Sequence, residues 1–175
     1  YLYNNQLTDL PREIGKLTNL QHLYLYNNQL TKFLPEICNL TNLKYLSLYN
    51  NQLTNIPAEI VNLTNLQTLY LTNNQLKNLP AEIGNLTNLK KLELRNNQLT
   101  NLPVEILKIK NSLIIDETSY EINNLNPEME IIVFTNLKEK ITNLPISLKK
   151  IWLKKDIDID IKLIKIPFGC DIMYF

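Results

Sequence analysis

LYNNQLT at Leu2–Thr8 recurs at Leu25–Thr31 and Leu48–Thr54, and it returns slightly changed as LTNNQLK at Leu71–Lys77 and LRNNQLT at Leu94–Thr100. Each copy starts 23 residues after the copy before it. A fixed period of this size is typical of a solenoid, in which each unit buries its apolar face against its neighbours. The stretch therefore predicts stacked repeats rather than an ordinary globular core.

The residues around each copy predict one short strand per repeat. Leu23 and Leu25 alternate with Tyr24 and Tyr26, which is the period of two that a strand requires. Because each repeat contributes one strand, we expect a parallel sheet with the leucines facing the core and the tyrosines facing solvent on the concave side. The equivalent strands are Leu43–Leu48, Leu66–Leu71 and Leu89–Leu94.

The opposite side of each repeat is predicted to be a short helical segment that follows a proline. Proline in a first helical turn loses no needed hydrogen bond, and a glutamate near that end suits the helix dipole. In the second unit Pro35 comes one position late while Glu36 keeps the register, so we expect a local change of turn with the stack intact. The prolines in the usual position are Pro11, Pro57, Pro80 and Pro103.

One asparagine of each repeat is interpreted as structural. An amide side chain has two donors and one acceptor group, so it can link the backbone of one turn to the next. We expect this ladder to hold the turns together rather than to bind a ligand. Its members are Asn5, Asn28, Asn51, Asn74 and Asn97.

The full unit, LxxLxLxxNxLxxxLPEIxxLTN, resembles the leucine-rich repeat family, in the 23-residue class with an LPxEI turn that intracellular Ras-pathway scaffolds and many microbial proteins contain. The resemblance covers residues 1–107, as a partial first unit and four 23-residue units. It implies an α/β repeat solenoid: a curved right-handed superhelix with a concave parallel β-sheet and short helical or 3-10 convex segments. The Asn-, Ile- and Lys-rich composition and the ending IPFGCDIMYF are also similar to leucine-rich repeat proteins of large DNA viruses that infect amoebae.

Residues 108–175 are interpreted as degenerate short repeats and an irregular β-rich C-terminal cap of the same continuous solenoid. Matching Ile115, Ile132 and Ile151 gives steps of 17 and 19 residues. The predicted strands are Leu113–Ile115, Glu130–Phe134 and Lys150–Leu153.

Strict alternation from Asp156 to Ile161 predicts a further strand with one charged face, which would stop edge-to-edge pairing. Its three carboxylates are a candidate calcium site only at first sight. A calcium loop of the EF-hand type would need glycine where Ile161 stands and glutamate where Pro167 stands. We therefore expect no metal site.

Composition and charge exclude several classes of function. A net charge of +1 disfavours electrostatic binding to nucleic acid or to an anionic membrane. No apolar run approaches the roughly 20 residues of a membrane span. With one histidine and three glycines, the chain offers neither a catalytic triad, nor a zinc site, nor a phosphate-binding loop. We expect a non-catalytic protein without a cofactor.

Cys38 and Cys170 are interpreted as free thiols in a reducing compartment, which predicts a cytoplasmic protein, in the host cytoplasm if the source is viral. Asn39, Asn62 and Asn85 match the N-glycosylation pattern, but they recur because the repeat recurs. They therefore say little about secretion.

The concave face carries the candidate binding residues, because its side chains are free of structural duty. Tyrosines crowd its N-terminal half and charged residues follow. The leading hypothesis is a monomeric protein-protein interaction module that binds a partner protein on this face. Three alternatives stay open: a tyrosine ladder that only stiffens the sheet or results from repeat duplication, self-association through the solenoid ends, and glycan or pattern recognition. The candidate residues are His22, Tyr24, Tyr26, Tyr45, Tyr49, Tyr70, Lys91, Glu93 and Arg95.

Overall fold

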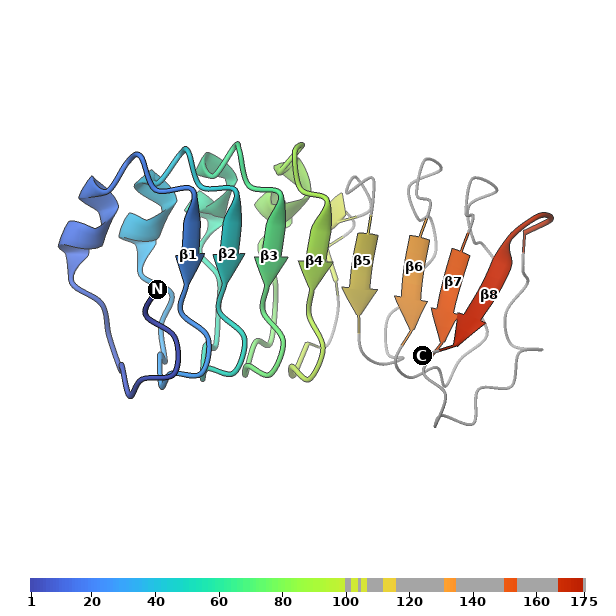
Figure 1. The fold of residues 1–175 in the computed structure, drawn as a ribbon, viewed down its shortest axis with the longest axis horizontal. Coiled ribbons are helices and arrows are strands. Elements are labelled where there is room, and N and C mark those ends of the chain that lie inside the picture. Colours follow the sequence, from blue (N-terminus) through green and yellow to red (C-terminus); the bar gives the residue numbers. More distant parts are fainter. Residues whose placement is uncertain are drawn as a thin grey trace.

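The computed structural model contains one sheet of eight parallel strands that follow one another in chain order from β1 to β8 (Figure 1). It describes residues 1–99, 102–103, 105–106, 112–115, 131–134, 150–153 and 167–174. Short 3-10 helices lie behind the first half of the sheet, so each of these repeats has a strand face and a helix face. The expected solenoid with a parallel sheet is confirmed.

The first four strands occupy the same place in their repeats. Pairing places Leu23, Leu46, Leu69 and Leu92 side by side, so the sheet register equals the sequence period. These four leucines are at most 4% exposed, and they form one continuous row of the core. The strands are His22–Tyr24 (β1), Tyr45–Ser47 (β2), Thr68–Tyr70 (β3) and Lys91–Glu93 (β4).

The convex segments are 3-10 helices, and their prolines differ slightly from the expectation. Pro11, Pro57 and Pro80 have extended backbone and stand just before their helices rather than inside the first turn. Pro35, the exception in the sequence, is the first residue of its helix, and the helix keeps its 23-residue register. The intact stack is therefore confirmed, but the expected change of turn is not seen, because Leu34 has the extended backbone that the prolines have in the other repeats. The helices are Arg12–Lys16 (η1), Pro35–Asn39 (η2), Ala58–Asn62 (η3) and Ala81–Asn85 (η4).

A buried asparagine fastens each turn to its neighbours. Asn51 is 7% exposed, and its Nδ2 donates to the carbonyl oxygens of Leu25 and Leu48, both at 3.0 Å. Its Oδ1 accepts from the backbone N–H of Leu30 at 3.1 Å. Asn28 and Asn74 repeat this pattern one turn away on either side.

A second asparagine ladder, which the sequence analysis did not single out, runs beside the first. Its members adopt φ between 52° and 56°, the left-handed region that Asn tolerates better than most residues. Asn27 Nδ2 donates to Asn4 Oδ1, and Asn50 Nδ2 donates to Asn27 Oδ1, both at 2.6 Å. Each amide thus donates to the preceding repeat. The ladder comprises Asn4, Asn27, Asn50, Asn73 and Asn96.

The sheet continues through the C-terminal third. Three strands agree with the prediction, but the register does not: Leu113, rather than Ile115, pairs with Ile132, so this step is 19 residues and not 17. The last strand was not predicted, and the alternating run at residues 156–161 lies outside the described residues. These strands are Ser112–Ile115 (β5), Ile131–Phe134 (β6), Lys150–Leu153 (β7) and Asp171–Tyr174 (β8).

Candidate binding face on the concave sheet

One row of tyrosines follows the ends of the first strands. Tyr3, Tyr26 and Tyr49 stack with ring centroids 4.6 Å and 4.4 Å apart and ring planes inclined by only 4° and 8°. Rings stacked in this way cover one another's faces, so the row offers edges and hydroxyls to solvent. Burial, and then the nearby Tyr49 and Tyr3 hydroxyls, raise the pKa of Tyr26.

A second aromatic row crosses the strands themselves. Tyr1 stacks on Tyr24, but the next position in the row is Ser47 on β2. Tyr45 bridges this gap, with its ring 4.9 Å from that of Tyr24 and 5.4 Å from that of Tyr70. Ser47 is therefore only 1% exposed, and its Oγ has no hydrogen-bond partner among the described residues.

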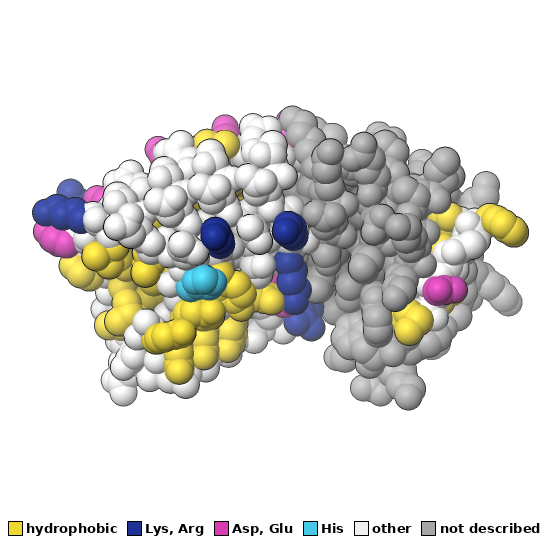
Figure 2. All heavy atoms as spheres, turned by 45° about the horizontal axis from the view of Figure 1, so that its top comes forward, with side chains coloured by type: hydrophobic (Ala, Val, Ile, Leu, Met, Phe, Trp, Pro, Cys, Tyr) yellow, Lys and Arg dark blue, Asp and Glu magenta, His cyan; other side chains and the backbone are white. Residues whose placement is uncertain are grey.

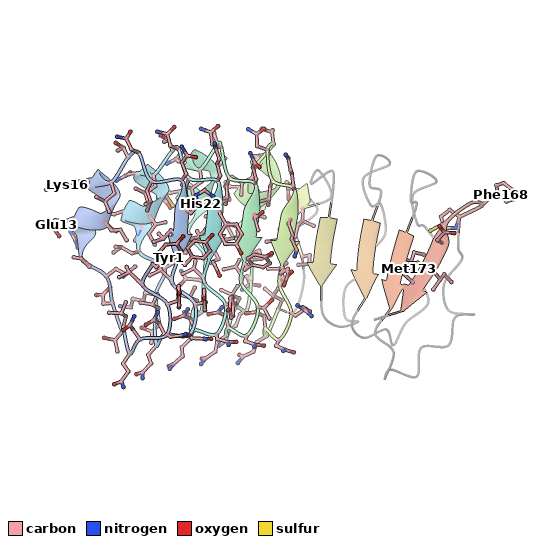
Figure 3. All side chains as sticks on the ribbon, viewed as in Figure 1. Tyr1, Glu13, Lys16, His22, Phe168 and Met173 are labelled. Atoms are coloured by element: carbon pink, nitrogen blue, oxygen red, sulfur yellow. The ribbon has the colours of Figure 1, made fainter. Side chains whose placement is uncertain are left out.

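The bridging ring is electrostatically coupled to its neighbours. Burial, followed by Tyr70, Tyr24 and Glu93, raises the pKa of Tyr45, so its hydroxyl stays protonated well into the alkaline range. His22 is exposed beside it, with ring centroids 6.3 Å from Tyr45 and 6.4 Å from Tyr24. Figure 3 shows His22 and Tyr1 on the sheet face turned to the viewer. The two rows meet at the edge-to-face pair of Tyr1 and Tyr3, whose ring centroids are 6.0 Å apart. We call the part of both rows that the sequence analysis singled out the tyrosine strip: Tyr24, Tyr26, Tyr45, Tyr49 and Tyr70.

A charged cluster adjoins the strip on β4. Glu93 is 7% exposed and pairs with Lys91 Nζ at 2.8 Å and Arg95 Nη2 at 3.1 Å. Lys91 Nζ also donates to the Tyr70 hydroxyl at 2.9 Å and lies 4.8 Å from the centre of that ring. Burial lowers the pKa of Lys91, but its bonds to Glu93 and Tyr70 outweigh this, and the pKa is raised overall. The cluster thus joins the aromatic and charged parts of the face.

The structure places all nine candidate residues on one face, where Tyr1 and Tyr3 join the Tyr26–Tyr49 pair to the rest. Glu93 has a different place from the others, because its nearly buried carboxylate holds Lys91 and Arg95 and offers little area to a partner. Sequence reasoning did not include Ser47 and Thr72, whose hydroxyl oxygens are buried without a hydrogen-bond partner in the described part of the chain. The sequence did contain a signal for this burial, because both residues are small and stand in rows of large aromatic residues.

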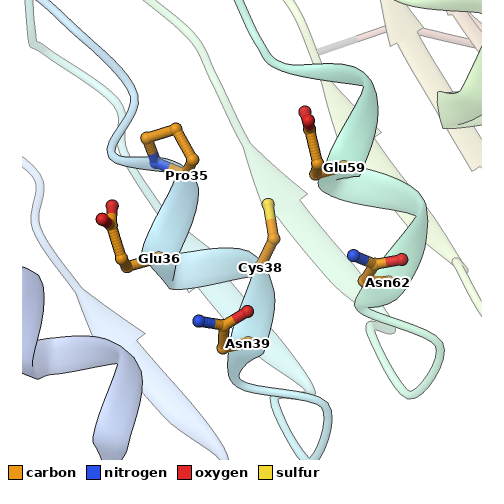
Figure 4. Close-up of a pocket in the computed structure, with 6 residues that line it drawn as sticks. All are labelled: Pro35, Glu36, Cys38, Asn39, Glu59 and Asn62. Carbon is orange, nitrogen blue, oxygen red and sulfur yellow. The ribbon is translucent and has the colours of Figure 1, made fainter.

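The convex side has one groove of note, between η2 and η3 (Figure 4). It has a volume of about 240 Å³, and Cys38 points into the space between the two helices. Burial, and then the charge of Glu59, raise the pKa of Cys38 to about 12, so the thiol is protonated at neutral pH and is a poor nucleophile. The groove is lined by Pro35, Glu36, Cys38, Asn39, Glu59 and Asn62.

Metal and membrane sites were sought across the described ranges. No group of three or more His, Cys, Asp or Glu side chains there is arranged to hold a metal ion. No helix in the same part of the chain has the length and apolar character needed to cross a membrane.

Stacked parallel strands, one per repeat, with a 3-10 helix opposite each of the first four and an asparagine in each turn, define a solenoid repeat protein. The chain belongs to the leucine-rich repeat family. The family model described as leucine-rich repeat region matches residues 32–113, and the model of two leucine-rich repeat copies matches residues 1–39. No curated protein sequence matches the chain significantly.

Solved structures share the fold over nearly the whole chain. An internalin, InlF of Listeria monocytogenes, is 24% identical with a TM-score of 0.70; the match covers 97% of this chain and 52% of the internalin chain. The functional domain of InlJ from the same organism is 23% identical with a TM-score of 0.68, over 99% and 37% of the two chains.

A plant protein gives a similar match. The leucine-rich repeat ectodomain of the receptor kinase GASSHO1/SCHENGEN3 from Arabidopsis thaliana is 22% identical with a TM-score of 0.68, over 95% of this chain and 25% of the receptor chain. It was solved in complex with CASPARIAN STRIP INTEGRITY FACTOR 2. The present chain therefore spans about half the length of the internalin InlF and a quarter of the receptor ectodomain chain.

Proposed function

We propose that this chain is a non-catalytic protein-binding module that holds a partner polypeptide against its concave face. The observation that carries the proposal is the tyrosine strip, in which Tyr24, Tyr45 and Tyr70 contact one another from β1 to β3. Tyr26 stacks on Tyr49 just after the first two strands. Tyrosine contributes a large contact area at low entropic cost and is enriched at binding hot spots. Mutual stacking restricts these side chains before a partner arrives, so less freedom is lost on binding.

The geometry of the rings favours a polypeptide over a glycan. Sugars pack on open aromatic faces, whereas the Tyr26 and Tyr49 faces are already stacked on each other. The strip presents ring edges and hydroxyls, which suit the mixed apolar and hydrogen-bonding surface of a polypeptide. The complex of the GASSHO1/SCHENGEN3 ectodomain supports the same direction for a protein of this fold.

Affinity capture from native cell extract, read by mass spectrometry, tests the proposal. The first variant, Tyr24→Ala/Tyr26→Ala/Tyr49→Ala, removes the strip and should lose the partner. Each deleted ring also removes aromatic contacts of about 0.2–1 kcal/mol, so the variant is compared at a temperature where circular dichroism shows it folded.

A second variant tests the face without deleting a stacked ring. Thr68→Trp adds bulk on β3, next to Tyr45 and Lys91 in the sheet register. Its control is Ala58→Trp, which adds the same bulk at an exposed convex position. We expect Thr68→Trp to lose the partner and Ala58→Trp to retain it. Capture of the same proteins by wild type and both concave variants would overturn the proposed face.

We also propose that the protein functions in the cytoplasm. Both cysteines are free thiols, and Asn39, Asn62 and Asn85 are exposed in the structure. Passage through a glycosylating compartment would give these three sites access to the modifying enzyme. The intact mass of native protein tests the proposal: we expect no added glycan, and occupied sites would contradict it.

A further inference from the structure

We propose that the partner presents an acidic, extended polypeptide segment. This inference rests on the proposed function and specifies the chemistry of the ligand. An apolar or aromatic side chain of the segment would lie on the tyrosine strip, and carboxylates would lie on Lys91 and Arg95. Three observations on the first four repeats carry this assignment: the distribution of charge, the state of Glu93, and the extent of the strip beside the charged cluster.

The sheet side of these repeats is mainly basic, and the helix side is mainly acidic. On β1 to β4 and the residues that directly follow them, the only acidic side chain is Glu93, whereas Lys91 and Arg95 are basic and His22 is exposed. Exposed Lys44 and Lys90 directly precede β2 and β4. Figure 2 shows dark-blue basic side chains and the cyan histidine beside a yellow hydrophobic surface. The described 3-10 segments lie on the opposite side, and their basic residues are Arg12 and Lys16 of η1. They are outnumbered by five glutamates: Glu13, Glu36, Glu59, Glu82 and Glu105.

Glu93 does not cancel this positive field. Its carboxylate is nearly buried and pairs with two cations, so the cluster of three side chains keeps a net charge of +1. Lys91 uses two of its three ammonium donors, on Glu93 and Tyr70, and the third has no acceptor among the described residues. The side chains of Lys91 and Arg95 are 38% and 35% exposed, so a carboxylate in solution can reach both.

The extent of the strip limits the length of the segment. The cluster adjoins the strip at Tyr70, and the far end of the strip, Tyr24 on β1, lies three strand intervals, or roughly 14 Å, from β4. About four residues of an extended chain cover that distance. A fitting segment therefore carries an apolar or aromatic residue at one position and carboxylates within about four positions of it.

Selection from a displayed library of random peptides of about twelve residues, on immobilised wild-type protein, tests the inference. A peptide of that length spans the roughly 14 Å and leaves several residues on either side of it. We expect the enriched peptides to be acidic, with an aromatic or large aliphatic residue within about four positions of the acids. The same library is selected in parallel on Tyr24→Ala/Tyr26→Ala/Tyr49→Ala to identify peptides that need the strip.

Enriched peptides are then synthesised and their affinities measured by fluorescence anisotropy. Glu93→Gln removes the one acid of the cluster, so acidic peptides should bind about threefold tighter. Lys91→Gln/Glu93→Gln/Arg95→Gln removes the whole cluster without leaving a lone buried charge, and binding should weaken about tenfold or more. The control, Lys32→Gln/Lys77→Gln, removes two exposed charges away from the sheet and should change the affinity less than about twofold.

The possible results separate this inference from the proposed function. Enriched peptides that need the tyrosine strip but carry no acids would overturn the acidic partner and leave the binding face in place. Acidic peptides whose affinity does not rise with Glu93→Gln would also overturn it. Enrichment that is the same on wild type and on the tyrosine variant would overturn the binding face itself.

Discussion

Replacing the buried Asn51 by alanine tests how the turns hold the solenoid together. The substitution removes the bonds of Nδ2 to the carbonyl oxygens of Leu25 and Leu48 and the bond from the Leu30 N–H to Oδ1. The two carbonyls keep another amide donor, because Asn28 also bonds to Leu25 and Asn74 also bonds to Leu48. The Leu30 N–H, in contrast, loses the only acceptor that the structure gives it.

The magnitude follows from this asymmetry. One orphaned buried N–H costs about 1–3 kcal/mol, and each of the two lost but replaceable bonds contributes about 0.5–1.5 kcal/mol. The free energy of unfolding should therefore fall by roughly 3 kcal/mol or somewhat more. For a chain of this size, a loss of about 3 kcal/mol lowers the Tm by about 6–12 °C.

Chemical denaturation followed by circular dichroism, with Asn5→Ala as the matched control, measures the effect. Asn5 stands at the same repeat position, but it is exposed. Its side-chain Nδ2 donates to the carbonyl oxygens of Leu2 and Tyr3, which belong to its own turn. Asn5→Ala should cost less than about 1 kcal/mol. Equal losses for the two variants would refute the reasoning, because burial and the bond from the Leu30 N–H would then contribute nothing.

Three further predictions concern packing, backbone conformation and pH. Gly84→Ala should lower the free energy of unfolding by about 1–3 kcal/mol, and by more than Gly15→Ala does, as measured by thermal unfolding. The reason is that a Cβ at Gly84 would overlap the Glu105 carbonyl oxygen, whereas a Cβ at Gly15 would lie 2.7 Å from its nearest atom. Equal losses of stability would contradict this. Asn50→Ala should cost about 1 kcal/mol more than Asn50→Gly in denaturant melts, because φ is 53° there, and a more stable alanine variant would count against it. The folded protein holds the Tyr45 proton more tightly than the unfolded chain, so the unfolding free energy should fall as the pH rises above about 10. Tyr45→Phe should show a shallower fall in denaturation curves measured across that range, and an identical slope would refute the assignment.

Much of the fold followed from the repeat period alone. The period fixed the strand positions and correctly predicted an unbroken stack at Pro35. The expected change of turn there is absent, because Leu34 adopts the extended conformation that proline has in the other repeats. Beyond residue 107 the repeat weakens, and matching isoleucines instead of counting from Leu113 gave a wrong 17-residue step. β8 was missed because its sequence, DIMY, has no alternation of polar and apolar residues to distinguish it.

The candidate face was predictable as a set of positions but not as a set of contacts. Alternation placed the tyrosines and charged residues on one side of the sheet. The Tyr45 ring covers Ser47 and contacts Tyr24 and Tyr70 because of its side-chain conformation, which no sequence period specifies. The burial of Glu93 between Lys91 and Arg95 likewise depends on side-chain conformations in three dimensions.

The convex side gives this family of repeats a way to alter the shape of the opposite face. Gly15, Cys38, Val61 and Gly84 occupy one position on successive helices, and at both glycines the backbone of the next helical segment is too close for a Cβ. At Cys38 the helices instead leave an open groove of about 240 Å³. A residue larger than glycine at this position needs more room between neighbouring helices, and wider spacing at the back than at the strands in front increases the curvature of a solenoid. A single substitution at the back can therefore change the curvature that a partner meets at the front without altering any residue it touches.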